Sequence, residues 1–239
     1  MSCCTPTGYR TIFGPKTVDR DVRRYAKKGL VPSARWVFEC LHTADITGRT
    51  VLEIGGGIGD LQIELLEAGA AHATNIELID TYEDAAGTLI AERGLEQRID
   101  RRISDFALDA DAAPTADVVV MHRVVCCYPD PDTLIAAACE HSADQVAITV
   151  PNESWWVKLG FATMNTWLRV RRIGFQAYVH PVERMAAVAA IHGFHLTHKQ
   201  RRRMWTSMML ARESAGSAGG VREWGTAACI EHATHLNRR

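Results

Sequence analysis

The most constraining feature of this sequence is a glycine-rich loop between an apolar run and a helix-like stretch. Residues 51–60 read VLEIGGGIGD, so a buried strand runs into Gly55, Gly57 and Gly59, and a helix begins at once. Glycines let the backbone approach a ligand closely, and a helix amino terminus presents free N–H groups. The pattern predicts the first unit of a parallel α/β sheet and a nucleotide or cofactor site at the loop.

Between residues 50 and 150, apolar runs alternate with stretches of helical periodicity, which predicts βαβ units. The runs are continuously apolar, which is typical of strands covered on both faces. We expect strands at 50–54, 73–78, 101–104, 117–121 and 145–150, and helices at 59–68, 81–93 and 132–141. With an antiparallel pair at 195–200 and 205–211, these strands form a doubly wound, seven-stranded, mostly parallel sheet.

The carboxyl third changes character. Residues 154–171 read SWWVKLGFATMNTWLRVR and place Trp155, Leu159, Ala162 and Thr166 on one helical stripe. The helix is more apolar than an outer helix requires, so we expect it to cover something. We expect a helical leader over the cofactor site at 1–49 and a main domain at 50–212. A lid is inserted in that domain at 152–180, and a flexible tail follows at 213–239.

Composition excludes several classes of protein. A chain of 239 residues that is 47% hydrophobic can bury a full core as one domain. A net charge of −1 argues against a general nucleic-acid binder, and no run of ~18 apolar residues predicts a membrane span. The amino terminus lacks a secretion signal, so we expect a cytoplasmic protein with a small-molecule partner.

Charge is divided along the chain. Residues 1–50 carry a net +5, residues 51–150 a net −14, and residues 151–212 a net +8. Two interpretations stay open: the blocks neutralise one another across the folded surface, or the basic flanks line a pocket for an anionic substrate.

Three carboxylates stand at the expected ends of the first three strands. Glu53 precedes Gly55 by two residues, Glu77 follows the second strand beside Leu78, and Asp105 follows the third beside Phe106. A carboxylate like Glu77 can accept hydrogen bonds from both hydroxyls of a ribose. Asp105 can accept from an adenine amino group while Phe106 packs on the ring. Each acid alone could equally be a solvated acid at a strand end.

These residues carry a resemblance to the class I S-adenosylmethionine-dependent methyltransferases. The similarity covers residues 50–150 and continues to about residue 212. It implies cofactor contacts at Glu53, Gly55, Gly57, Gly59, Glu77, Leu78, Asp105, Phe106 and His122. Within this class, the lid and the Tyr128 region are similar to magnesium-protoporphyrin O-methyltransferase and its bacterial relatives. The charged loop after the lid in those enzymes is matched only loosely by residues 171–175, which puts porphyrin in doubt as the substrate.

Methyl transfer needs mainly alignment of donor and acceptor in a dry pocket. His122 ends the fourth strand, where ligands bind in open α/β sheets, and is the candidate general base. Alternatively, its backbone only holds the cofactor. Arg123 could orient a substrate carboxylate or form a local salt bridge. The histidines show no spacing typical of a metal site, so we predict none.

Four residues of the lid region are candidate substrate contacts. Trp155 and Trp156 could form a flat aromatic surface, with Arg171 and Arg172 holding carboxylates at its edge. An anionic aromatic or polycyclic molecule would suit such a surface, with O-methylation as the expected reaction. The competing interpretation is a lid packed on its own core with a solvated arginine end.

Two other functions are retained as alternatives. A nicotinamide-dependent oxidoreductase would use the same loop, but Asp60 stands where the dinucleotide fingerprint needs glycine or alanine. A non-catalytic protein could bind the cofactor, or a metal through the thiols of Cys3, Cys4, Cys126 and Cys127. Burial of Cys126 and Cys127 as small apolar residues is the alternative for those thiols.

Overall fold

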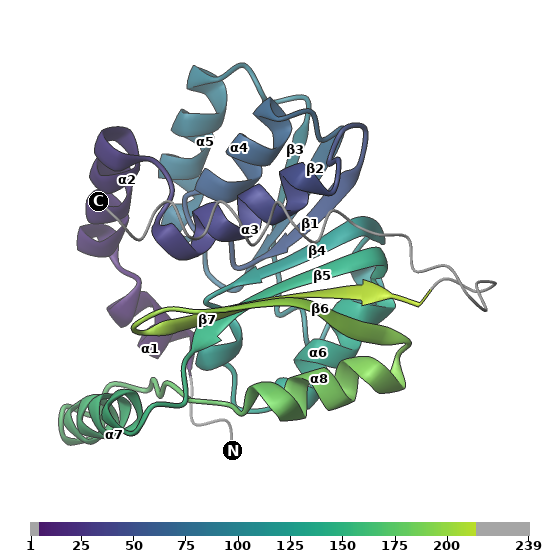
Figure 1. Ribbon diagram of the computed structural model, residues 1–239. Helices are drawn as coiled ribbons and strands as arrows, with labels where there is room; N and C mark the ends of the chain where they lie inside the picture. The colour runs from purple at the N-terminus through teal and green to yellow at the C-terminus, as the bar shows by residue number, and fades with distance from the viewer. Residues whose placement is uncertain (1–4, 214–239) are drawn as a thin grey trace.

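The computed structural model describes residues 5–213 and shows one twisted sheet between two layers of helices (Figure 1). The seven strands lie in the order β3-β2-β1-β4-β5-β7-β6, and β7 runs antiparallel to both of its neighbours. The strands are β1 Thr50–Ile54, β2 His72–Glu77, β3 Ile99–Ile103, β4 Ala116–His122, β5 Ser142–Pro151, β6 Phe194–Arg201 and β7 Trp205–Arg212. The predicted fold is confirmed, and each predicted strand begins within three residues of an observed one.

The helices are α1 Pro6–Ile12, α2 Pro15–Lys28, α3 Pro32–Thr43, α4 Asp60–Glu67, α5 Glu83–Glu92, α6 Pro131–Glu140, α7 Trp155–Val170 and α8 Val182–Ile191. Four of them, α1, α2, α3 and α6, begin with proline. Proline suits the first helical turn because the N–H it lacks would have no intrahelical partner there. The four prolines therefore fix where these helices start.

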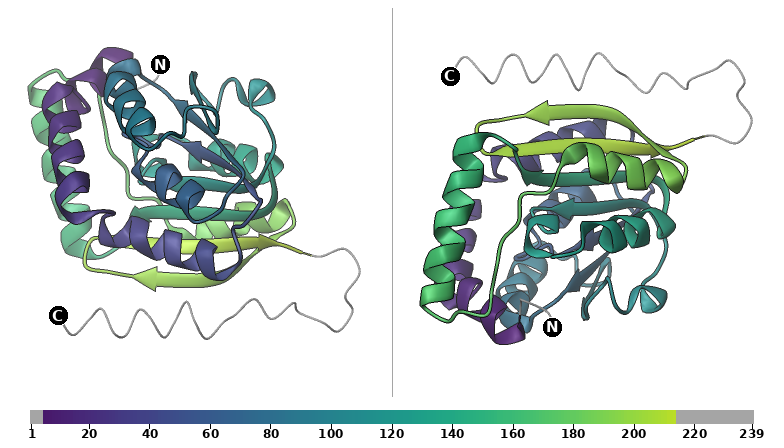
Figure 2. Two further views of the ribbon diagram at one scale, coloured as in Figure 1. Left: turned by 90° about the horizontal axis from the view of Figure 1, so that it is seen from above. Right: turned by 90° about the horizontal axis from the view of Figure 1, so that it is seen from below.

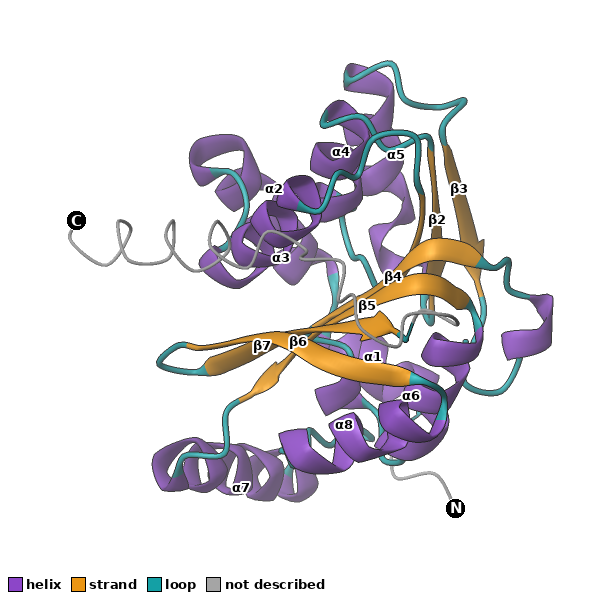
Figure 3. Ribbon diagram, turned by 45° about the vertical axis from the view of Figure 1, so that its right-hand side comes forward, coloured by secondary structure: helices purple, strands orange, loops and turns teal. Residues whose placement is uncertain are grey.

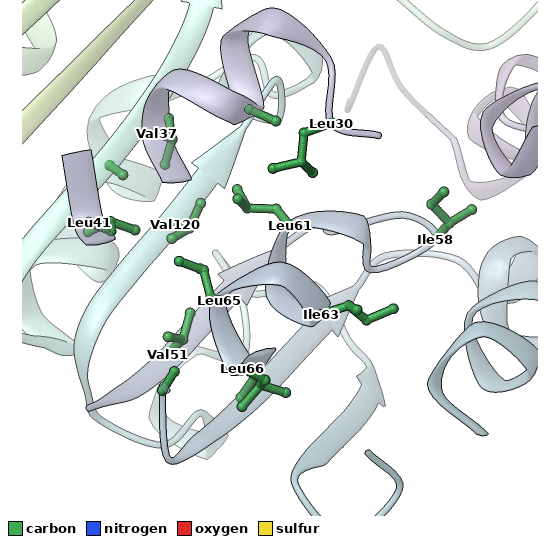
Figure 4. Close-up of a cluster of buried hydrophobic side chains, with 14 of the residues drawn as sticks. Leu30, Val37, Leu41, Val51, Ile58, Leu61, Ile63, Leu65, Leu66 and Val120 are labelled. Atoms are coloured by element: carbon green, nitrogen blue, oxygen red, sulfur yellow. The ribbon is translucent and has the colours of Figure 1, made fainter. Parts of the chain in front are cut away.

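Two apolar cores lie on the two faces of the sheet. Successive side chains of a strand point to opposite faces, so Val51 packs with α3, α4 and α5, whereas Leu52 packs with α6 and α8. Figure 4 shows part of the first core, in which Leu65 of α4 lies beside Val51 and Val120. A third, smaller cluster joins α1 to α7 through Tyr9 and Leu168 and to the segment after the lid helix.

The lid helix α7 packs with the opposite face from the one expected. The predicted stripe begins with Trp155 and Leu159, but their side chains are exposed. Only Val157 and Leu168 are buried. Figure 2 shows α7 along the outer edge of the molecule. Phe161 and Leu168 attach it on one side, where they pack with Tyr9 in the third cluster. The helical pattern was correct, but its packing face was not.

The expected flexible tail, 213–239, lies almost wholly outside the described residues. Within residues 5–213, no helix is both long and apolar enough to cross a bilayer.

The two-sided core generates a stability prediction. Leu65 in α4 is fully buried, so Leu65→Ala leaves a cavity, and we expect the free energy of unfolding to fall by about 3 kcal/mol. Ile191→Ala in α8 is the control, because Ile191 is 82% exposed and its loss should cost about 0.5 kcal/mol or less. Urea denaturation measures both; equal losses would contradict this description of the core.

Candidate functional site

The glycine loop connects β1 to α4 with three residues in the left-handed region. Gly57 has φ 60°, and a side chain there would be strained. Gly56 has an ordinary φ, but an added Cβ would lie 2.2 Å from Asn75 Nδ2 and 2.6 Å from Glu53 Oε2. The loop thus lies directly on the side chains beneath it. No residue larger than glycine fits at position 56 without displacing Asn75 or Glu53.

A buried carboxylate holds the middle of the loop. The Gly57 amide donates to Glu77 Oε1 at 2.5 Å, and Arg101 Nη2 donates to the Gly57 carbonyl oxygen at 3.0 Å. Arg101 also forms an ion pair with Glu83 at 2.7 Å. The loop is therefore clamped on both its N–H and its C=O side. Burial raises the pKa of Glu77 to about 7. The hydrogen bond from the Gly57 N–H acts in the opposite direction and lowers this pKa.

Glu53 lies deeper, below the same loop. It is 2% exposed, and its Oε2 is buried without a hydrogen-bond partner among the described residues. Burial, and next the charge of Asp60, raises the pKa of Glu53 to about 8. The carboxyl group is consequently protonated in much of the folded protein at neutral pH. Asp60, the first residue of α4, pairs with Arg24 of α2 at 3.1 Å.

A pocket of about 760 Å³ opens above the loop at the carboxyl ends of the parallel strands. Its walls include the predicted cofactor residues Gly55, Gly57, Glu77, Leu78, Asp105 and Phe106. Three predicted cofactor residues, Glu53, Gly59 and His122, do not line the pocket. Glu53 lies below the loop, and Gly59 lies at its end.

The amino-terminal helix α1 closes one side of this pocket. Tyr9 and Phe13 line it, and the Tyr9 hydroxyl donates to the carbonyl oxygen of Cys127 at 2.5 Å. Arg10 pairs with Asp80 at 2.9 Å, which fastens α1 to the turn after β2. A leader over the cofactor site was expected, and α1 is the part of it that reaches the pocket.

At the end of β4, His122 and Arg123 have different surroundings. His122 Nε2 lies 2.9 Å from Ser33 Oγ, and burial, with the charge of Arg123, lowers the pKa of His122 to about 3. Arg123 adopts φ 64°, donates from Nη2 to Ser33 Oγ at 3.0 Å, and stacks over the Trp205 ring at 4.3 Å. A left-handed arginine is strained, so this backbone is held by its surroundings.

Arg123 also lines both the pocket and a second, basic groove beside it. This groove, which we call the arginine groove, has a volume of about 1000 Å³. It is lined by Pro32, Ser33, Arg123, Arg201, Arg202, Arg203, Met204 and Trp205. None of its four arginines forms an ion pair with another of residues 5–213. Concentrated cationic charge without carboxylate partners is suited to an anion.

The turn that carries Arg201 to Arg203 is anchored rather than loose. Asn152, 2% exposed at the end of β5, donates from Nδ2 to the carbonyl oxygens of Arg202 at 2.8 Å and Arg203 at 2.5 Å. Figure 3 shows this turn between β6 and β7 projecting from the sheet between α3 and α7. The three arginines were not among the predicted site residues; three consecutive cations between two expected strands are the sequence signal that points to them.

The four predicted substrate residues do not form one surface. Trp155 and Trp156 begin α7 and Arg171 and Arg172 follow its end, so the two pairs are offset by 16 positions along the chain, or about 24 Å of helix. Trp156 lies under Arg203 at 6.0 Å, and Arg171 stacks on Trp167 at 5.4 Å. The expected single surface is therefore corrected to two separate groups, of which the Trp156 group borders the arginine groove.

The expected thiol cluster lies partly outside the described residues, because Cys3 and Cys4 precede them. Cys126 and Cys127 have sulfur atoms 3.9 Å apart, and Cys126 is 5% exposed. Across residues 5–213, no three potential ligands of the His, Cys, Asp or Glu type gather in a way that could hold a metal ion.

Comparison with known proteins gives a family and a set of similar structures. The family model described as a methyltransferase domain matches residues 19–211. A search among curated proteins finds no matching sequence.

Two solved structures illustrate the similarity. Magnesium protoporphyrin IX methyltransferase from Synechocystis PCC 6803, solved with bound SAH, is 17% identical with a TM-score of 0.67, over 85% of this chain and 98% of that one. An O-methyltransferase family protein from Burkholderia thailandensis is 18% identical with a TM-score of 0.67, over 88% of this chain and 64% of that one. At these identities the likeness concerns the fold.

A third similar structure is that of N,N-8-amino-8-demethyl-D-riboflavin dimethyltransferase from Streptomyces davawensis, which is 17% identical with a TM-score of 0.55. The similarity covers 86% of this chain and 62% of that one.

The buried acid under the loop generates a pH prediction. Because the folded-state pKa of Glu53 is raised from 4.5 to about 8, the folded protein keeps a proton that the unfolded chain loses. The stabilisation from that proton is complete below pH 4.5 and is lost as pH rises through about 8. Glutamine has no proton to lose, so Glu53→Gln lacks this loss of stability. As pH rises across this window, the free energy of unfolding of Glu53→Gln should therefore increase relative to that of the wild type.

Chemical denaturation at a series of pH values measures this difference, with the exposed Glu92→Gln as the control. A Glu53→Gln difference that is flat with pH, or one matched by the control, would show that Glu53 is ionised in the folded protein.

Proposed function

This chain belongs to the methyltransferase-domain family, and from that membership we propose that it transfers the methyl group of S-adenosylmethionine to a small anionic molecule, at an oxygen atom. The observation that carries the proposal is the pairing of two adjoining spaces. A pocket over the glycine loop meets an arginine-lined groove at one residue, Arg123.

The pocket residues fit S-adenosylmethionine. Glu77 faces the pocket from the end of β2, with one oxygen bound to the loop amide and a carboxylate geometry suited to ribose hydroxyls. Asp105 and Phe106 stand at the end of β3, where an adenine ring would find an acceptor and an apolar wall. A Cβ added to Gly57 would lie in van der Waals contact with the Tyr82 ring, 3.6 Å from its nearest atom, so glycine keeps the space between the loop and this ring free.

When bound, this cofactor supplies a methyl group already activated on a sulfonium. The chain then has to exclude water and align the acceptor. Tyr9 of α1 and Phe13, the residue that follows α1, exclude water from the donor side, because they line the pocket and α1 is fastened through Cys127 and Asp80.

In this proposal the acceptor binds in the arginine groove. Arg123 reaches the groove and the pocket alike, so a molecule held by the groove arginines would lie beside the donor pocket. Arginine pairs with carboxylate or phosphate through two parallel hydrogen bonds, which orients the bound anion as well as attracting it. Trp156, under Arg203, offers an aromatic edge to such a molecule.

The environment of His122 bears on which oxygen is methylated. A base with a pKa of about 3 is badly matched to a hydroxyl proton, and His122 does not line the donor pocket. A carboxylate acceptor is already ionised and needs no base. The surroundings thus support a carboxylate oxygen as the acceptor and a positioning role for His122, which holds Ser33 and through it Arg123.

The two alternatives draw less support. The buried Asp60 at the start of α4, paired with Arg24, places a carboxylate where a dinucleotide pyrophosphate would bind, which disfavours a nicotinamide cofactor. Thiol-metal binding would need Cys3 and Cys4, which lie outside the described residues.

The donor assignment predicts a loss of cofactor affinity. Glu77→Ala should weaken S-adenosylmethionine binding by ~1–3 kcal/mol, because charge-assisted hydrogen bonds to the ribose are lost. Calorimetric titration with S-adenosylmethionine, S-adenosylhomocysteine and NADH measures it, with the exposed Glu92→Ala as the matched control. Unchanged affinity in Glu77→Ala would remove Glu77 from the site, and tight NADH binding would contradict the donor assignment.

The acceptor assignment predicts a separate effect. Arg202→Gln with Arg203→Gln should raise KM for an acidic acceptor by about tenfold or more, since two charge-assisted contacts are lost, with S-adenosylhomocysteine affinity unchanged. Formation of S-adenosylhomocysteine is measured with a panel of aromatic carboxylic acids and their methyl esters. Arg184→Gln is the control, because Arg184 is an exposed arginine of α8 paired with Asp132.

Methylation of the esters as fast as the acids would contradict a carboxylate acceptor. In the same assay His122→Gln should raise KM without changing the shape of the pH profile of kcat. Loss of the acidic limb from that profile would instead identify His122 as the general base.

A further inference from the structure

The outward face of α7 is an apolar surface that the rest of the described chain leaves uncovered. Trp155 and Val170 are each 76% exposed, Leu159 is 58% exposed and Trp167 is 52% exposed. Trp155 and Leu159 are four residues apart, and Leu159 and Val170 are eleven apart. At 3.6 residues per turn, both spacings place the residues on the same side of a helix. These exposed apolar residues, which we call the stripe, therefore share one side of α7, two toward each end, with Thr163 and Thr166 between them on the same side.

This stripe has a different role from the site described above. None of the four exposed residues of the stripe lines the cofactor pocket or the arginine groove, although Trp156 of the same helix borders that groove. The helix is attached from its other side, through Phe161 and Leu168 against Tyr9 and Phe175. Figure 1 shows α7 at the periphery, below α1 and away from the sheet. The exposed stripe faces outward while its helix is held firmly.

The charge around the stripe has one sign. From residue 154 to residue 182 the sequence contains no Asp or Glu, and Lys158, Arg169, Arg171 and Arg172 give this segment four cations. At 100° per residue, Lys158 and Arg169 lie beside one another on one flank of the stripe. Arg203 adds a further cation over Trp156 at the amino-terminal end of α7.

We propose that α7 binds the surface of a bilayer that contains anionic lipid, lying flat with Trp155, Leu159, Trp167 and Val170 in the interface. An apolar stripe flanked by Lys and Arg, with Trp toward both ends, is the combination that binds in the plane of such an interface. Long cationic side chains extend from the flank to the lipid phosphates while their stems stay on the apolar surface. The inference does not rest on the methyltransferase proposal.

The charge also decides against a second copy of this chain as the occupant. Two copies that paired their stripes antiparallel across a twofold axis would bring Lys158 and Arg169 of each against the same cations of the other. With no acid in the segment to compensate, that contact is repulsive. An anionic lipid surface supplies the missing negative charge.

The test is co-sedimentation of the full chain with vesicles of phosphatidylcholine, with and without phosphatidylglycerol. We expect binding to the anionic vesicles, little to the neutral ones, and weakening as salt is raised. Lys158→Gln with Arg169→Gln should lower the partition coefficient by about 30-fold. Trp155→Ser, Leu159→Ser and Val170→Ser together should lower it by at least about tenfold.

Ile191→Ser is the matched control, because Ile191 is 82% exposed and apolar but lies on α8, a helix that carries Glu183 as well as Arg184; it should bind like the wild type. Affinity for S-adenosylhomocysteine, measured on every variant, checks that each has folded and is independent of vesicle binding.

Several outcomes would overturn the proposal. These are no binding to anionic vesicles, equal binding to neutral ones, or binding that survives the triple serine substitution. Self-association of the wild-type chain that the triple substitution abolishes, without vesicle binding, would assign the stripe to a second copy instead.

Discussion

The hydrogen bond from the Gly57 amide to the buried Glu77 carboxylate is the contact on which the site depends. It fixes the loop after β1, in which three glycines have left-handed backbone conformations, and it holds the Glu77 carboxylate facing the pocket. The contact buries Glu77, and Glu53 lies buried below the same loop; burial raises the pKa of both carboxyl groups. Arg101 offsets part of the cost of burying Glu77, and it also holds the carbonyl oxygen of Gly57. The glycine loop therefore lies directly on two buried acids.

A second constraint lies at the end of β4. Arg123 occupies a left-handed backbone conformation that arginine rarely adopts, and Ser33 and Trp205 hold its side chain from two different elements. This residue joins the cofactor pocket to the arginine groove, so its strain lies where donor and acceptor would meet. Asn152 fixes the neighbouring arginine turn from the end of β5. Both devices place cationic side chains at the carboxyl edge of the sheet, where the parallel strands end together.

The helices outside the sheet have separate tasks. Helix α1 closes the pocket through Tyr9 and Phe13, and α7 supports α1 from behind through Leu168. Because α7 is anchored by one narrow side, its remaining apolar surface faces solvent. A helix that supports the cover of one site is thereby free to present a second surface, and the two are coupled only through the small cluster at Tyr9.

The sequence by itself determined the alternating strands and helices, the glycine loop, and the positions of Glu77, Asp105 and Phe106 around it. These follow from local rules: apolar period, glycine conformation, and the fact that parallel strands end at one edge. Tertiary structure alone decided that α7 turns its Trp155 stripe outward, that His122 bonds to Ser33, and that the turn at Arg201 to Arg203 faces Arg123. Each of these depends on which distant element packs against a residue. Periodicity gives a helix its apolar stripe, but only the neighbouring elements decide whether that stripe is covered.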